Sequence, residues 1–308
     1  MKQLYYSAWR AMNCDVSVQL ETQADGKALL GGLPAEVEAI EARLSRFRAN
    51  SELMELNARA GQWVTASEVL FKNVHAAKQA SRLTDGMFNP LVLPALVAAG
   101  YDRSFPNIRQ PETTHPVPAA DWRGIGLRPT THEVRIPAES ALDLGGVTKG
   151  WTAARVADEL AAYGPCLVNI GGDLVARGAP QGLAGWEVSV EDPFDHHALA
   201  TLWLRDAALV TSGTDFRRWT NANGVEQHHI VDPRTGSPAE TDVLTVTVHH
   251  PHAPTAEAYA KAVLLRGAQA GLDWLQSQWN AAGLVVRRDG AVLATADFTD
   301  LIQQRTTM

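Results

Sequence analysis

Two glycine turns that lie close together in the sequence constrain the fold of this chain more than any other feature. The first, Asp143–Gly150, reads Asp-Leu-Gly-Gly-Val-Thr-Lys-Gly, and the second, Asn169–Asp173, reads Asn-Ile-Gly-Gly-Asp. Paired glycines let the backbone approach a ligand closely. A helical pattern follows the first turn, and the free N–H groups at the start of a helix favour a phosphate.

Lys149 lies in the first turn of that predicted helix and would add a mobile positive charge. This combination suits a nucleotide pyrophosphate. A tight turn between a strand and a helix would also need the glycines, but it would not need Lys149. From this stretch alone, a nucleotide-binding turn and a purely structural turn are equally supported. The second glycine pair favours the nucleotide-binding turn.

The composition is that of a globular protein with a sizeable core. The chain has 308 residues, of which 45% are hydrophobic and 20% are charged. Its net charge of -7 gives no electrostatic case for nucleic acid as a partner. Cys14 and Cys166 lie in apolar surroundings without metal-ligand spacing, so both are expected to be buried free thiols.

The sequence carries no membrane or export signal that we can identify. The first residues contain no apolar core of signal-peptide length and no cysteine placed for lipidation. No stretch approaches the roughly 20 apolar residues that a membrane span needs. We therefore expect a cytoplasmic protein without a membrane span.

The spacing of apolar residues predicts helices and strands in an irregular order. Helices are expected at 34–47, 67–85, 151–162, 255–267 and 268–279. Strands are expected at 12–21, from Ala141, and at 166–170, 186–190, 200–204, 208–210, 227–231 and 244–249, with a hairpin at 284–298. Because the strands come in runs, this pattern predicts an α+β fold with a mixed β-sheet and flanking helices.

We expect residues 1–308 to form a single domain, with one surface excursion. Residues 100–138 are rich in proline and polar residues and form the predicted excursion. Before them, residues 87–96 are apolar but contain Pro90 and Pro94, so neither a regular helix nor a central strand is expected there.

Four motifs together resemble those of the ApbE family, the FAD:protein FMN transferases. They are the two glycine turns, the tripeptide Thr211-Ser212-Gly213, and residues 229–236, which read His-Ile-Val-Asp-Pro-Arg-Thr-Gly. They occur in the order found in the family, and the resemblance covers nearly the whole chain. It implies an ApbE-like, T-fold-like domain.

The resemblance implies an enzyme that binds FAD and Mg²⁺. Such enzymes cleave the pyrophosphate and attach FMN through a phosphoester to a Ser or Thr hydroxyl of a target protein, releasing AMP. The implied partners are FAD and an acceptor protein with a flavinylation motif. The alternative is a protein that binds FAD without transferring it, or that acts as a slow FAD pyrophosphatase. The altered metal helix described below and the absence of an export signal favour this alternative.

The same resemblance implies which residues contact FAD. They are Met12, Phe47, Met87, Phe88, Asn89, Asp143, Lys149, Gly172 and Val231. Three of these positions depart from the family. An aromatic hydroxyl or an indole is common in the family where Phe47 stands. Met12 is followed by Asn13-Cys14 where the family usually reads Gly-Thr, and Asn89-Pro90-Leu91 stands where the family has Asp-x-Thr.

The largest departure concerns the implied metal site. The family holds Mg²⁺ with a backbone carbonyl, here at Gly146, and with a helix that reads Ala-Asp-x-x-x-Thr. The corresponding residues here are Ala-Glu-Ala-Tyr-Ala-Lys, from Ala256 to Lys261. Glu257 can still ligate Mg²⁺ through carboxylate oxygen. Lys261 cannot ligate while protonated, because an ammonium group has no lone pair.

Glu257 and Lys261 lie four residues apart, on one face of the predicted helix. They either form a surface ion pair worth roughly a few tenths of a kcal/mol, or Lys261 occupies the place of the metal and supplies its positive charge. The alanines and leucines around them favour the second interpretation, which predicts that FAD binds without a divalent metal.

His229 is the histidine with motif support. It would either orient a phosphate and accept the proton of the target hydroxyl, or serve as a structural histidine beside Asp232, and the sequence leaves both open. His229 and Lys261 are therefore the expected catalytic residues.

Overall fold

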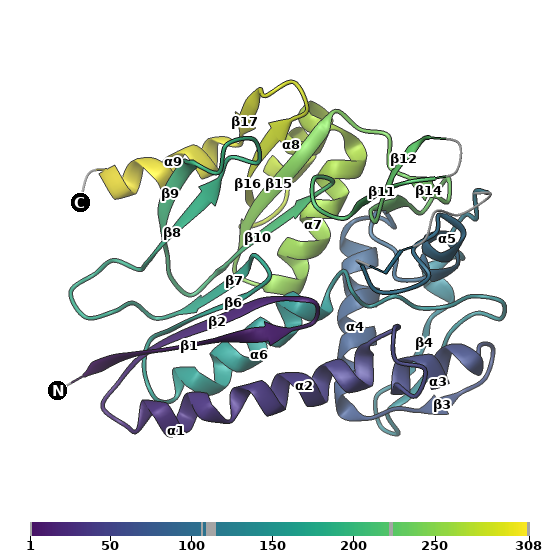
Figure 1. Cartoon of the computed structure of the whole chain (residues 1–308), viewed down its shortest axis with the longest axis horizontal. Helices are drawn as coiled ribbons and strands as arrows, with labels where there is room; N and C mark the ends of the chain where they lie inside the picture. Colours follow the sequence, from purple (N-terminus) through teal and green to yellow (C-terminus); the bar gives the residue numbers. More distant parts are fainter. Residues whose placement is uncertain (1, 106, 109–114, 222–223, 307–308) are drawn as a thin grey trace. The chain divides into compact units, whose positions relative to one another are not determined.

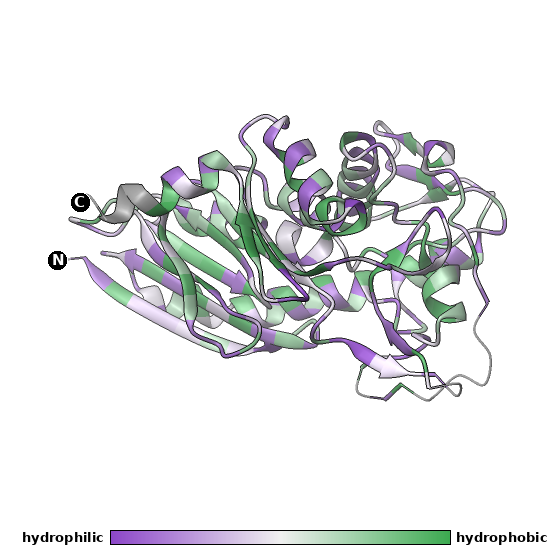
Figure 2. Cartoon of the chain, turned by 90° about the horizontal axis from the view of Figure 1, so that it is seen from above, coloured by the Kyte–Doolittle hydropathy of each residue, from purple (hydrophilic) through white to green (hydrophobic). Residues whose placement is uncertain are grey.

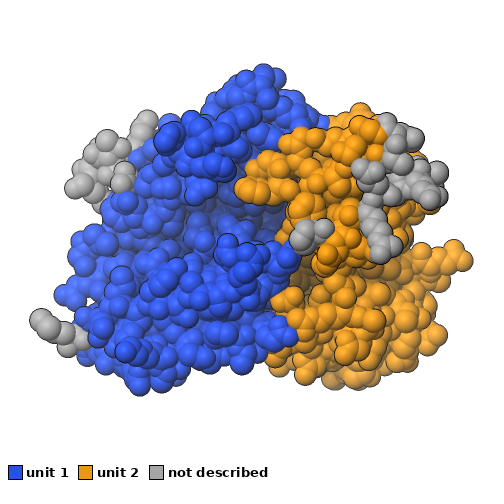
Figure 3. Space-filling view, viewed as in Figure 1, with its two compact units in different colours: residues 1–38, 149–213, 241–308 blue, residues 39–148, 214–240 orange. Residues whose placement is uncertain are grey.

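The computed structural model describes residues 2–105, 107–108, 115–221 and 224–306, with no side chains from residue 303 onward. The chain divides into two compact units (Figure 3). The sheet unit comprises residues 1–38, 149–213 and 241–308, and the second unit comprises residues 39–148 and 214–240. Each unit is built from segments that are distant in sequence, and the expectation of a single domain over 1–308 stays a prediction.

An eight-stranded sheet organises the sheet unit (Figure 1). Its order is β1 (Gln3–Ala11), β2 (Cys14–Thr22), β6 (Cys166–Ile170), β7 (Asp173–Arg177), β10 (Ala208–Gly213), β15 (Val243–His250), β16 (Ala282–Arg287) and β17 (Val292–Ala294). Every pairing between these described strands is antiparallel. The α+β fold class with a sheet and flanking helices is confirmed.

Two of the hairpins in this sheet close with two-residue turns. Met12 and Asn13 join β1 to β2 with φ values of 51° and 56°, and Gly171 and Gly172 join β6 to β7 with φ values of 60° and 92°. Two consecutive residues with positive φ form the tight turn that matches the twist of paired strands. The second glycine pair is thus a hairpin turn. The strand expected from Met12 starts at Cys14, because Met12 belongs to the turn.

Helices cover one face of the sheet. This face carries Val18, Val168 and Val175 at paired positions. The covering helices are α6 (Thr148–Ala161), α7 (Ala253–Arg266) and α8 (Ala268–Gln276). The thiol of Cys166 on β6 donates a hydrogen bond to the carbonyl oxygen of Ala157 on α6, at 3.3 Å.

The other face carries a second hydrophobic core. There Leu167, Leu209 and Leu284 pack beneath the hairpin of β8 (Trp186–Glu191) and β9 (Ala198–Leu204). The helix α9 (Ala296–Thr306) contributes the fully buried Phe298. Figure 2 shows hydrophilic and hydrophobic residues interleaved along the strands, as burial on one side requires. The predicted hairpin over 284–298 is shorter than expected, because the chain becomes helical at Ala296.

The second unit is built from short elements. After α1 (Gly26–Gly31), the helix α2 (Leu33–Leu44) begins in the sheet unit and ends in the second. The remaining elements are α3 (Glu52–Ala58), β3 (Val64–Thr65), α4 (Glu68–Leu83), α5 (Leu93–Ala98), a 3₁₀ turn (Trp122–Gly124), β4 (Gly126–Arg128), β5 (Glu133–Arg135), β11 (Arg218–Thr220), β12 (Glu226–His228), β13 (Val231–Asp232) and β14 (Ser237–Pro238). Ser67 caps α4 as predicted, since its hydroxyl accepts the N–H of Leu70 at 3.2 Å.

The second unit also corrects three expectations. Residues 87–96 are irregular only up to Val92, because Pro94 occupies the first turn of α5, where a missing N–H costs nothing. Residues 141–144 form no strand, and the strand expected over 227–231 breaks at His229. Around residue 142 the backbone bonds to a side chain in place of a neighbouring strand, since Asn57 bonds both the N–H and the carbonyl oxygen of Leu142.

The predicted surface excursion over 100–138 is partly buried. Trp122, Ile125, Val134 and Ile136 belong to the core, and β5 pairs with β3 on one side and with β4 on the other. Residues 106 and 109–114 of this segment lie outside the described residues. Among the described helices, none is long and apolar enough to cross a membrane.

Candidate functional site

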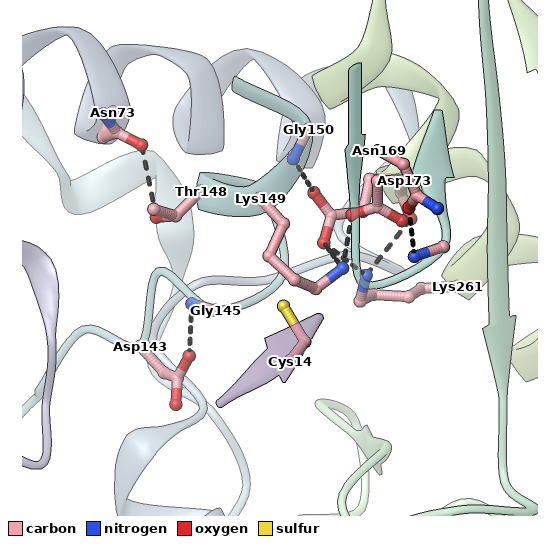
Figure 4. A network of polar contacts seen from close by, with 12 residues as sticks. Cys14, Asn73, Asp143, Gly145, Thr148, Lys149, Gly150, Asn169, Asp173 and Lys261 are labelled. Carbon is pink, nitrogen blue, oxygen red and sulfur yellow. Dashed lines mark hydrogen bonds and ion pairs between the residues drawn. The ribbon is translucent and has the colours of Figure 1, made fainter. Parts of the chain in front are cut away.

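The first glycine turn leads into α6 as predicted. The helix begins at Thr148, whose hydroxyl donates to the side-chain oxygen of Asn73 at 3.2 Å. Lys149 lies in the first turn of the helix, where the expectation placed it (Figure 4). Its side chain reaches two carboxylates from other elements of the sheet unit.

These groups form a cluster of two lysines and two carboxylates, which we call the Lys–carboxylate cluster: Lys149, Asp173, Glu257 and Lys261. The ammonium group of Lys149 donates a short hydrogen bond to Asp173 and lies 3.5 Å from Oε1 of Glu257. Lys261 lies one turn after Glu257 on α7, with its Nζ also 3.5 Å from Oε1. Figure 4 shows the amino groups of Lys149 and Lys261 close together beside Asp173.

The elements that carry the cluster explain why it forms. Asp173 is the first residue of β7, directly after the Gly171-Gly172 turn, and it pairs with Ile170 on the face that the helices cover. The start of α6 brings Lys149 to that face, and α7 packs beside it. Three segments that are distant in sequence therefore supply the four charges.

Burial and charge act against each other in this cluster. Asp173 and Glu257 have side chains 0% and 1% exposed. Burial raises the pKa of Asp173 to about 6, although Lys149 opposes the shift. Burial lowers the pKa of Lys149, but the charges of Asp173 and Glu257 outweigh it and hold the pKa above its ordinary value. Burial lowers the pKa of Lys261, against the opposing charge of Glu257.

The second oxygen of Glu257 serves the start of α6. Oε2 accepts the backbone N–H of Gly150 at 3.3 Å. This N–H is one of the first-turn donors that have no partner within the helix. Gly150 lets the two helices approach, because a Cβ there would stand 3.2 Å from both Oε2 of Glu257 and the backbone of Ala253.

Cys14 borders the cluster at the end of the Met12-Asn13 turn (Figure 4). A Cβ added to Gly171 would stand 2.8 Å from its Cβ and from its Sγ. The thiol donates to the carbonyl oxygen of Ala11 at 3.2 Å. Neither cysteine forms a disulfide, as predicted, but only Cys166 is buried as expected, because Cys14 lies at the edge of a hairpin turn. Met12 and Gly172, two predicted FAD contacts, thus lie in neighbouring turns of the same sheet.

The second unit contains the other predicted FAD contacts. Asp143 forms a buried ion pair with Arg46, 2.7 Å from Oδ2 to Nε, and its Oδ1 accepts the N–H of Gly145 at 2.6 Å. Its backbone N–H donates to the carbonyl oxygen of Pro90 at 2.8 Å. Asp143 therefore also has a structural role, because its hydrogen bonds and ion pair stabilise the first glycine turn.

Arg46 also stacks on aromatic rings. Its guanidinium lies 4.2 Å from the ring centre of Phe47 and 4.3 Å from that of Tyr101. Tyr101 in turn lies 5.6 Å from the ring of Trp219, whose indole N–H donates to Ala99. Phe47 remains 41% exposed, so a predicted FAD contact offers an accessible ring edge.

The remaining predicted contacts are buried. Met87 and Phe88 are 7% and 6% exposed. Asn89 uses its amide within the unit, donating to Ala120 at 2.9 Å and accepting the N–H of Leu91 at 2.9 Å. Val231 packs with Tyr101 and Leu96 in an apolar cluster.

The two adjacent histidines differ in their surroundings. His228 is buried, and its ring nitrogens contact the carbonyl oxygen of Ala239 at 3.0 Å and the N–H of Ile230 at 3.3 Å. These contacts assign His228 a structural role. His229 lies half-buried at the bend between β12 and β13, with its backbone N–H donating to Arg217. The catalytic role expected for His229 stays a prediction.

Sequence reasoning missed Arg46, Asp173, Tyr101 and Trp219. Asp173 closes the second glycine motif, so an acid directly after a glycine pair was an available signal. Arg46, Tyr101 and Trp219 come together only through the fold. Of the expected metal ligands, Gly146 belongs to the second unit and Glu257 to the sheet unit. The described residues contain no group of three or more His, Cys, Asp or Glu placed to hold a metal ion.

Comparisons with known proteins agree with the motifs. The family model described as "ApbE family" matches residues 12–285. A protein named FAD:protein FMN transferase from Treponema pallidum is 30% identical over 283 residues, which cover 84% of this chain and 77% of that protein. A protein of the same name from Klebsiella pneumoniae is 31% identical over 249 residues, covering 75% and 73%.

Solved structures agree with the fold. The crystal structure of the ApbE protein from Thermotoga maritima superimposes with a TM-score of 0.85 at 25% identity, covering 97% of this chain and 99% of that chain. The flavinyl transferase ApbE from Pseudomonas stutzeri, in its apo form, gives a TM-score of 0.82 at 23% identity over 98% and 97% of the two chains.

Proposed function

The chain belongs to the ApbE family, and on this basis we propose that it transfers the FMN part of FAD to a hydroxyl group of a target protein. The observation that carries this proposal is the family match over residues 12–285, together with two relatives of 30% and 31% identity named FAD:protein FMN transferase. The acceptor would be a Ser or Thr hydroxyl, and the products would be a flavinylated protein and AMP.

The proposed reaction exchanges a phosphoanhydride bond for a phosphoester bond. The hydroxyl oxygen forms a bond to the phosphorus on the FMN side of the pyrophosphate. The bond from that phosphorus to the bridging oxygen breaks, and AMP leaves with its electron pair. The proton of the hydroxyl passes to a base, for which His229 is the candidate from the motif.

Positive charge near the pyrophosphate is the main contribution that the protein can make. Phosphoryl transfer depends on positioning and on stabilising the charge that develops on phosphate oxygens. Lys149 and Lys261 are the charged groups proposed for this purpose, because they lie beside the turn that carries the glycine pair. FAD contacts for Met12, Phe47, Met87, Phe88, Asn89, Asp143, Gly172 and Val231 remain proposals on the strength of the family pattern.

A direct test incubates the purified chain with FAD and a protein domain that carries a flavinylation motif. Intact-mass measurement would detect the acceptor plus FMN, and chromatography would detect AMP in equal amount. A matched acceptor with its Ser or Thr changed to Ala must stay unmodified. Failure to form an adduct while FAD binds would contradict the proposal.

The alternative function has its own signature in the same experiment. A slow FAD pyrophosphatase would release FMN and AMP together, without an adduct on the acceptor. A protein that only holds FAD would leave it intact.

A further inference from the structure

The Lys–carboxylate cluster has no net charge, and its lysines lie closer to solvent than its carboxylates. It pairs two ammonium groups with two carboxylates, all within the sheet unit. The side chains of Lys149 and Lys261 are each 19% exposed, whereas Asp173 and Glu257 are 0% and 1% exposed. The lysines therefore form the outer layer, and a ligand approaching from solvent meets ammonium groups before it meets carboxylate.

This arrangement does not fit a divalent metal at Glu257. Mg²⁺ takes oxygen ligands at about 2.0–2.1 Å in octahedral geometry. Both oxygens of Glu257 face N–H groups: the two lysine ammonium groups lie 3.5 Å from Oε1, and Oε2 accepts the Gly150 N–H at 3.3 Å. An ammonium group cannot act as a ligand, and two of them beside the same oxygen would repel the incoming cation.

The two lysines are held differently. Lys149 donates a hydrogen bond to the buried Asp173 and also lies beside Glu257. The hydrogen bonds from Lys261 to Glu257 are long, 3.4 Å to its carbonyl oxygen and 3.5 Å to its Oε1. Contacts of that length are weak. A diphosphate oxygen could therefore compete with Glu257 for the Lys261 ammonium group.

We propose that Lys261 is a resident cation of this chain, which binds the diphosphate of FAD and makes a divalent metal unnecessary for that binding. The proposal rests on the proposed function, because it concerns the same ligand. Glu257 then serves to hold the start of α6 and to keep Lys261 in place. Lys261 acts as a binding and positioning residue toward the phosphates.

The test measures FAD binding to the full chain by quenching of flavin fluorescence, in chelator and in Mg²⁺. We expect the wild-type dissociation constant to agree within about twofold between the two conditions. Lys261→Met should weaken binding by about 10- to 100-fold, the range for losing a hydrogen bond to a charged group. Lys261→Arg should retain most of the affinity.

Lys72→Met is the matched control. Lys72 pairs with Glu68 at the same i,i+4 spacing, but on an exposed face of α4, with side chains 54% and 64% exposed. Its loss should leave FAD affinity unchanged. Because Lys261→Met leaves Glu257 with less compensating charge, the double variant Glu257→Gln/Lys261→Met is measured beside it. Circular dichroism reports whether each variant is folded.

The wild-type comparison decides the proposal without any variant. If chelation weakens FAD binding at least about tenfold and Mg²⁺ restores it, the proposed role of Lys261 is overturned. The proposed transferase function would still stand if the adduct forms in Mg²⁺. Binding in both conditions without adduct supports the resident cation and contradicts transfer. If FAD binds neither in chelator nor in Mg²⁺, the proposed role of Lys261 and the proposed transferase function are both overturned.

Discussion

Arg46 and Asp143 form an ion pair that is almost closed to solvent, with Nε and Oδ2 2.7 Å apart and side chains 6% and 13% exposed. The pair joins the segment after α2 to the first glycine turn, within the second unit. Arg46 also donates to the carbonyl oxygen of Tyr101 at 2.7 Å. One guanidinium group therefore holds the glycine turn and the aromatic residues together.

The first prediction concerns this pair. Arg46→Ala should lower the free energy of unfolding by about 3–5 kcal/mol, because it leaves the Asp143 carboxylate buried without its partner. Arg43→Ala is the control, since Arg43 pairs with Glu52 at 3.4 Å with its own side chain 53% exposed, and it should cost about 0–1 kcal/mol. Urea unfolding measures both, and equal losses would contradict the structural role of Arg46.

The second prediction concerns Gly236, which has a φ of 75°. A Cβ there would stand 2.1 Å from the backbone carbon of Val117. Gly236→Ala should therefore destabilise the chain by about 2–4 kcal/mol, through backbone strain and a clash that a rotamer change cannot relieve.

Gly290→Ala is the matched control for Gly236. Gly290 has a φ of 85°, but nothing lies within 4 Å of an added Cβ. It should cost only about 1 kcal/mol, the strain of the left-handed conformation. Thermal unfolding of the two variants compares them directly. If Gly236→Ala lowers stability no more than Gly290→Ala does, the prediction of a clash with Val117 is contradicted.

The third prediction is a dependence of stability on pH. His249 pairs with Leu209 and Ala282 on neighbouring strands, and burial, with the charge of His250, lowers its pKa from 6.5 to about 4. Between these values the unfolded chain binds a proton that the folded chain does not, so folding stability should fall as pH falls from 6.5 to 4. The loss from this residue should be about 2–3 kcal/mol.

The measurement is urea unfolding at several pH values. His249→Gln removes the titrating group, so the wild type should lose stability relative to this variant as pH falls from 6.5 to 4. His75→Gln, at an exposed position on α4, controls for the loss of a histidine. A constant difference between wild type and His249→Gln across this range would contradict the prediction.

The fourth prediction separates the two thiols. Burial raises the pKa of Cys166 from 9.0 to about 12, which lowers the thiolate fraction by about 1,000-fold. Iodoacetamide should therefore leave Cys166 unmodified in the folded chain, whereas the half-buried Cys14 should react. Peptide mass mapping identifies the modified residue. In denatured protein, both Cys14 and Cys166 should be modified. Rapid labelling of Cys166 in the folded chain would contradict the prediction that burial protects this thiol.

Local sequence signals predict those parts of the site that depend on neighbours in the chain. Glycine pairs require particular backbone conformations, so the amino-acid sequence alone locates the turns at 145–146 and 171–172. The helix that starts beside Lys149 and the i,i+4 placement of Glu257 and Lys261 follow from helical geometry alone. The family resemblance adds the ligand and the reaction.

Local signals fail where two patterns coincide. The sequence over 284–298 favours a hairpin, yet α9 begins at Ala296, where the hydroxyl of Thr295 accepts the N–H of Phe298 at 3.3 Å as a helix N-cap does. Proline and polar residues dominate 100–138 and favour an excursion, although Trp122 and Ile136 enter the core. Burial of a few residues is not visible in the average composition of a segment.

The sequence by itself therefore determined the family, the α+β class, the glycine turns and the helical spacing of Glu257 and Lys261, because each depends on residues that are close in the chain. Only the tertiary structure decided that Asp173 and Lys149 complete the cluster around Glu257, and that Arg46 holds Asp143. Those pairings join segments that are distant in sequence. Their charges are perturbed because packing removes water from around them, and a one-dimensional pattern does not record which distant side chains share that dry environment.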